Sequence, residues 1–74
     1  MQKIPKVGDP GKVKALRKWG AAREGEVFTG TWMQAARPEQ IRLELHDLPQ
    51  ATQHPIILMN RNTGACIIKN FELV

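Results

Sequence analysis

The sequence predicts a mostly β fold in one small domain. Six glycines and five prolines divide the 74 residues into short apolar stretches, as is typical of strands joined by turns. Residues 26–33 are rich in valine, phenylalanine, threonine and tryptophan, the side chains that strands favour. Residues 40–46 alternate apolar and polar side chains, which is the pattern of a strand with one buried face.

The first predicted element, residues 10–19, can be interpreted as a short helix or as a strand. Asp9 is a favoured N-cap and Pro10 suits the first helical position, while Gly20 would follow the last turn. These local signals favour the helix. The alternative is a strand, in which apolar and basic side chains would alternate between the two faces, with Leu16 and Arg17 as exceptions. Residues 1–9 are expected to form an extended N-terminal arm.

The next two elements are predicted as strands. Residues 26–33 carry Gly30 near the middle, which indicates a bend, a bulge or the close approach of another backbone. Residues 40–46 form the second of these strands, and its buried face is made by Ile41, Leu43 and Leu45.

The C-terminal third predicts a hairpin and a final strand. Residues 55–59 and 65–69 are short apolar runs on either side of the sequence NRNTG. Asn62 and Gly64 in this sequence can adopt positive φ, so the connection is expected to be a short hairpin loop. The last four residues, FELV, would add one more strand.

Charge is distributed unevenly along the chain. The net charge is +4, but residues 1–23 hold seven basic groups and one acidic group, whereas residues 24–74 hold four basic and six acidic groups. The first segment is therefore +6 and the second −2. Such an asymmetry indicates a polyanion or an acidic protein surface as the partner.

Residue types that usually carry catalysis or bind metals are sparse. Cys66 is the only cysteine and lies in an apolar run, so we expect it to be buried. With His46 and His54 it does not complete the four ligands of a structural zinc site. His46 and Asp47 are neighbours on a strand and would point to opposite faces, which argues against a catalytic pair. We therefore expect a protein that is not an enzyme and needs no cofactor or metal.

Three stretches resemble strands of the Sm-like family, whose members are short five-stranded β-barrels that bind RNA as rings. GEVFTGTW resembles the second strand, IRLELHDL the third strand, and IIKNFELV the closing motif. The resemblance spans about residues 12–74. It implies a small five-stranded antiparallel barrel, with room for a short N-terminal helix at 10–19, and a homo-oligomeric assembly. It also implies base contacts at Gln40, Lys69 and Asn70.

The function predicted first is that of a small basic module that binds RNA or single-stranded nucleic acid. The expected contact residues are Lys12, Lys14, Arg17, Lys18, Trp19, Arg23, Gln40, Lys69 and Asn70. Basic side chains would neutralise phosphates and Trp19 would stack on a base, although so few aromatic residues also favour both Trp19 and Trp32 as core.

The alternative function is a protein-interaction module, such as a phage- or plasmid-type regulator that docks on an acidic surface of a larger machine. In both cases we expect a cytoplasmic protein. The longest purely apolar run, Ile56–Met59, is far too short to span a membrane.

Overall fold

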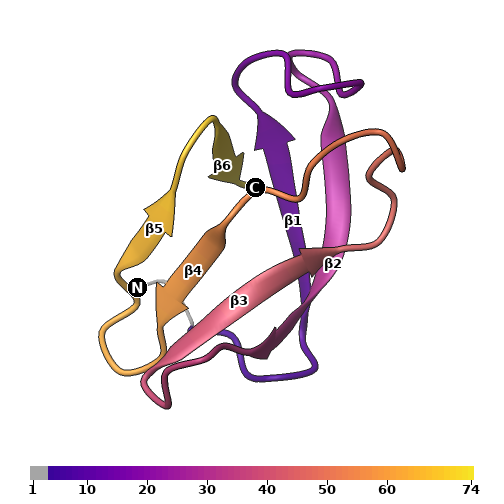
Figure 1. The fold of residues 1–74 in the computed structure, drawn as a ribbon. Coiled ribbons are helices and arrows are strands. Elements are labelled where there is room, and N and C mark those ends of the chain that lie inside the picture. Colours follow the sequence, from indigo (N-terminus) through magenta and orange to yellow (C-terminus); the bar gives the residue numbers. More distant parts are fainter. Residues whose placement is uncertain (1–3) are drawn as a thin grey trace.

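The computed structural model describes residues 4–74, which form six strands and no helix (Figure 1). The strands are β1 (Pro10–Ala15), β2 (Val27–Gln34), β3 (Gln40–Leu45), β4 (Ile57–Asn60), β5 (Cys66–Ile68) and β6 (Phe71–Leu73). The mostly β class is confirmed. Two details differ from the prediction: there are six strands instead of five, and of the two alternatives for residues 10–19 the helix is wrong, because a strand forms over Pro10–Ala15. No helix that could cross a membrane occurs in the described part of the chain.

The strands form one antiparallel sheet that curls into a nearly closed barrel. The sheet order is β5-β4-β3-β2-β1-β6. The two outermost strands are consecutive in the chain, so the edges of the sheet are joined by Lys69 and Asn70 (Figure 1). Asn70 has a φ of 64°, a left-handed conformation that asparagine tolerates better than most residues. This turn separates β5 from β6, between the predicted strand at 65–69 and the predicted last strand, FELV.

The helix alternative for residues 10–19 fails because Asp9 and Gly20, which resemble helix caps, lie in turns of the structure. The carboxylate of Asp9 accepts a hydrogen bond from the backbone N–H of Lys6 at 2.9 Å, so it closes a turn before β1. Gly20 has a φ of 58° and lies in the connection between β1 and β2. Residues 10–15 form a strand instead because β1 pairs with β2 on one side and with β6, which is distant in sequence, on the other.

Alternation along the strands directs one set of side chains into the barrel. The buried apolar residues are Val13, Ala15, Ala22, Phe28, Trp32, Ile41, Leu43, Leu45, Ile57, Met59 and Phe71. Trp32 is only 3% exposed, which confirms its predicted place in the core. Cys66 is exposed, contrary to the prediction, because β5 is a short edge strand that pairs only with β4.

Gly30 allows two backbones to approach closely, one of the possibilities that its position predicted. A Cβ atom at Gly30 would lie 2.3 Å from the carbonyl oxygen of Glu44 on β3. Gly30 pairs with Gly11 on β1 and with Leu45 on β3, so two glycines lie opposite each other at this point. The absence of side chains here lets the sheet bend sharply enough to close.

The N-terminal segment lies against the end of the barrel formed by the β2–β3 and β4–β5 turns. Ile4 is half-buried against the core, close to Gly64 in the β4–β5 turn. The backbone N–H of Gly8 donates a hydrogen bond to the carbonyl of Trp32 at 2.7 Å. Residues 4–9 of the predicted arm are therefore attached to the barrel, and residues 1–3 lie outside the described residues.

Candidate functional site

Three connections meet at one end of the barrel, because all neighbouring strands are antiparallel and alternate connections share an end. We call this surface the loop end; it consists of residues 16–26, 46–56 and 69–70. The backbone N–H of Leu16 donates to the carbonyl of Asn70 at 2.7 Å, which joins the β1–β2 and β5–β6 connections. The N–H of Ala21 donates to the hydroxyl of buried Thr52 at 2.9 Å, which joins the β1–β2 and β3–β4 connections. Figure 1 shows these connections around the upper part of the barrel.

Trp19 fixes the loop end. It is half-buried, and its ring packs edge to face on Phe71 with ring centroids 5.8 Å apart. Its indole N–H donates a hydrogen bond to the backbone carbonyl of Gln53. One side chain of the first connection therefore contacts both the second connection and the start of β6. The indole is held in one orientation, with part of its surface facing solvent.

A hollow beside Trp19 brings together two residues that the sequence prediction singled out. Trp19 and Lys69 line this hollow, whose volume is about 180 Å³, together with Gln53, His54, Pro55 and Ile56. Ile56 is 72% exposed, which is unusual for an aliphatic side chain of its size. The hollow thus combines an aromatic surface, an aliphatic surface and a single cation.

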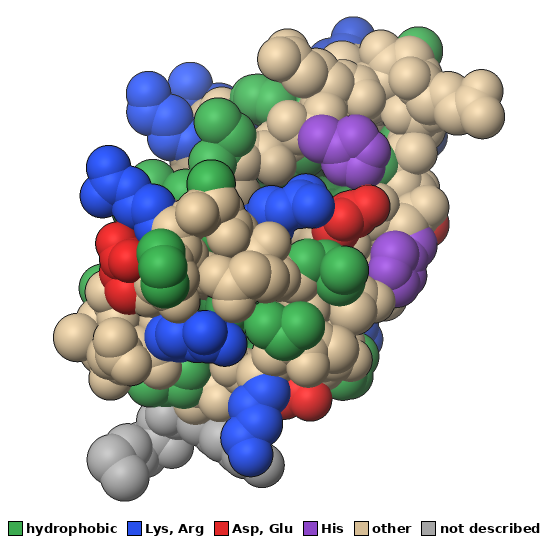
Figure 2. Space-filling model, turned by 60° about the horizontal axis from the view of Figure 1, so that its bottom comes forward, with side chains coloured by type: hydrophobic (Ala, Val, Ile, Leu, Met, Phe, Trp, Pro, Cys, Tyr) green, Lys and Arg blue, Asp and Glu red, His purple; other side chains and the backbone are tan. Residues whose placement is uncertain are grey.

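Four basic side chains surround this end of the barrel. They are Arg17, Lys18, Arg23 and Lys69, and all four are exposed. The ion pairs found among residues 4–74 involve other basic groups, namely Lys14, Arg37 and Arg42. Glu24, Glu26 and Asp47 also lie in these connections and are exposed, so the loop end carries four basic and three acidic side chains. The face seen in Figure 2 differs, since its charged side chains are scattered among hydrophobic ones.

The structure does not bring all nine predicted contact residues together. Six lie at the loop end: Arg17, Lys18, Trp19, Arg23, Lys69 and Asn70. Lys12 and Lys14 lie on β1, where the ammonium group of Lys14 is 3.1 Å from the carboxylate of Glu72. Gln40 pairs with Asn60 at the opposite end of β4 from Lys69. Within one chain, Gln40 therefore does not share a site with Lys69 and Asn70.

Comparisons with known proteins add no family to this geometry. No family model matches the chain, and no similar curated protein or solved structure is found. The interpretation of the loop end therefore depends on its own residues.

The sequence prediction missed four of the six residues that line the hollow, namely Gln53, His54, Pro55 and Ile56. Ile56 was expected in the strand at 55–59 and His54 was considered as a metal ligand, yet both line the hollow beside Trp19. The sequence feature that could have indicated Ile56 is its position directly after His54 and Pro55. Ile56 is exposed because β4 begins one residue later, at Ile57.

No three His, Cys, Asp or Glu side chains among residues 4–74 are grouped so that they could hold a metal ion. The Nε2 atom of His46 lies 2.8 Å from the hydroxyl oxygen of Thr31, on the outside of the sheet. The loop end presents cations, an oriented indole and a hollow close together.

Proposed function

We propose that this protein is a small binding module that contacts RNA or single-stranded nucleic acid through the loop end. The observation that carries the proposal is the hollow lined by Trp19 and Lys69, which lies among further exposed basic side chains. Proteins that bind single strands combine aromatic surfaces for the bases with basic groups that follow the backbone. The loop end has both components within a few residues of each other.

Each component has a distinct role in this proposal. A base would enter the hollow and stack against the solvent-facing part of the indole, a contact worth about 1–3 kcal/mol per base. The hydrogen bond from Trp19 to the Gln53 carbonyl holds the ring in place before binding, so little entropy is lost on stacking. Lys69, Arg17 and Lys18 would neutralise phosphates on either side of the base.

The proposal is tested by the salt dependence of oligonucleotide binding. Each neutralised phosphate of a single strand contributes about −0.7 to the slope of log K against log salt concentration. Three or four contacts therefore predict a slope of about −2 to −3 for short single-stranded RNA or DNA. Fluorescence anisotropy from about 50 to 200 mM salt measures this slope. Binding that is absent at low salt, or unchanged over this range, contradicts the proposal.

A pair of double variants with the same net charge locates the surface. Arg17→Gln with Lys18→Gln removes two charges at the loop end, and should lower the affinity and reduce the slope by about 1.4 in magnitude. The control is Arg37→Gln with Arg61→Gln, which removes two exposed charges at the opposite end of the barrel. The control should retain most of the affinity. Equal losses in both variants would indicate that only net charge matters.

An acidic protein partner is the other outcome of the experiment. Such a partner would meet the same basic groups without needing the hollow. A protein that stays bound to this chain after nuclease treatment, while no oligonucleotide binds, would replace the nucleic-acid proposal by the protein-interaction alternative.

A further inference from the structure

The outer surface of four neighbouring strands, β2 to β5, carries an apolar patch around one ion pair. We call it the outer patch; its residues are Met33, Arg42, Glu44, Ile56, Leu58 and Ile67. The strand register places four of these side chains in one row across the sheet, because Met33 pairs with Arg42, Arg42 with Leu58, and Leu58 with Ile67. All four point away from the barrel interior. The patch therefore arises from side chains that the core does not use.

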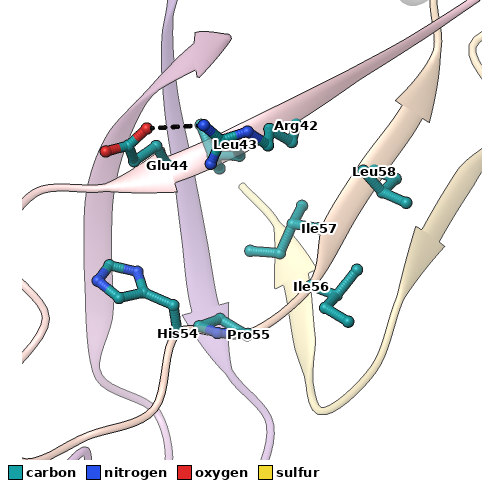
Figure 3. Close-up of a pocket in the computed structure, with 8 residues that line it drawn as sticks. All are labelled: Arg42, Leu43, Glu44, His54, Pro55, Ile56, Ile57 and Leu58. Atoms are coloured by element: carbon teal, nitrogen blue, oxygen red, sulfur yellow. Dashed lines mark ion pairs between the residues drawn. The ribbon is translucent and has the colours of Figure 1, made fainter. Parts of the chain in front are cut away.

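Solvent reaches the apolar members of the outer patch. Ile56 is 72% exposed, Ile67 is 60% exposed and Met33 is 37% exposed. The pairing of β3 with β4 ends at Arg42 and Leu58, and beyond this point the two segments separate. A hollow of about 310 Å³ lies there between residues 42–44 and residues 54–58 (Figure 3). A partner that covered this face would remove several aliphatic side chains from water.

The two charged side chains in the middle of the patch can pair with the same two side chains of a second copy. The guanidinium of Arg42 lies 3.4 Å from the carboxylate of Glu44, and each side chain is about half-exposed (Figure 3). Under a two-fold axis that passes between these residues, the same cation and anion in a second copy face each other in reverse order. We propose that the outer patch is the interface of a homodimer, in which Arg42 of each copy meets Glu44 of the other copy.

This arrangement of charges favours a second copy over other partners. A polyanion would be repelled by Glu44, and an acidic protein would gain only from Arg42. A second copy satisfies both groups and covers the aliphatic side chains around them. A chain of 74 residues also has a small core, so association is a common source of additional stability.

The dimer is expected to be weak. Six side chains are far fewer than the about 20–30 residues that each partner contributes to a standard interface. Association should therefore depend on concentration between about 10 µM and 1 mM. The two surfaces share Ile56, which also lines the hollow beside Trp19, but Arg42 and Glu44 do not line that hollow, so substitutions at these two residues test the dimer separately from nucleic-acid binding.

Charge exchange across the interface tests the proposal by sedimentation equilibrium. The native chain should shift from 8.3 kDa towards twice that mass as its concentration rises. Arg42→Glu and Glu44→Arg each create two like-charge contacts per dimer, and each variant should weaken association by about 10-fold or more. Both residues are half-exposed, so the monomers should remain folded.

A mixture of the two single variants provides the decisive control. In the mixed dimer every contact again joins opposite charges, so an equimolar mixture should regain the native association. The double variant Arg42→Glu with Glu44→Arg should also regain it. A native chain that stays at 8.3 kDa up to about 1 mM would overturn the proposal. Association that survives both single variants, or that mixing does not restore, would overturn it as well.

Discussion

Replacement of Gly30 by alanine should destabilise the barrel strongly, because the added methyl group meets backbone atoms. A Cβ at this position would lie 2.3 Å from the Glu44 carbonyl oxygen and 3.0 Å from the Cα of Leu45. Ordinary van der Waals contact begins at 3.4 Å, so the carbonyl oxygen would have to move by about 1.1 Å to reach it. Such a shift separates β2 from β3 where Gly30 pairs with Leu45 and Thr31 pairs with Glu44.

The cost of this change can be compared with the total stability. Overpacking costs about 1–3 kcal/mol, and we expect about 3 kcal/mol here because backbone cannot rotate away as a side chain can. A domain of this size is stable by about 3–5 kcal/mol, so Gly30→Ala should leave about 2 kcal/mol or less. Urea denaturation followed by tryptophan fluorescence measures the difference.

A second glycine gives the matched control. Gly8 has a φ of 97° and no atom within 4 Å of an added Cβ, so Gly8→Ala introduces backbone strain without a clash. It should cost about 1–2 kcal/mol. A loss below about 1 kcal/mol for Gly30→Ala, or a loss no larger than that of Gly8→Ala, would refute the reasoning about close approach.

Three further predictions concern other contacts. Thr52→Val should lower the free energy of unfolding by about 1–3 kcal/mol, since it leaves the N–H of Ala21 without its hydroxyl acceptor; an unchanged urea midpoint would contradict this. Lys14→Gln should change stability by less than about 0.5 kcal/mol, because its ion pair with Glu72 is exposed to water; a larger loss in the same assay would show that the pair is stronger than its exposure suggests. Desolvation raises the pKa of the Cys66 thiol, so at neutral pH the group is protonated and iodoacetamide should react more slowly than with free cysteine, with a rate that rises through a midpoint above that of free cysteine; a midpoint at or below it contradicts the prediction.

Strands with strong alternation were predictable from the sequence, and the first element was not. In residues 40–46 the apolar side chains recur at every second position, and the structure forms β3 there. For residues 10–19 the local signals at Asp9 and Gly20 favour a helix, yet both residues lie in turns of the structure. The strand forms because β2 and β6 pair with it from both sides, and no window of local sequence contains that information.

The candidate site was predictable only in its parts. Trp19 and Lys69 were both named from the sequence, one as a stacking residue and the other through the family resemblance. Their common hollow depends on the hydrogen bond from Trp19 to Gln53 and on the turn at Asn70. These contacts join loops that are distant in sequence. They form only when the barrel closes, so the sequence alone does not predict the hollow.

An NMR titration with a short single-stranded oligonucleotide tests the central claim most directly. Backbone amide shifts report which end of the barrel the ligand contacts, without any substitution. We predict that the largest shifts occur in residues 16–23 and 69–70, together with the indole N–H of Trp19. Shifts confined to the opposite end, around Gln40 and residues 60–65, would contradict the assignment of the loop end, and so would a spectrum that does not change.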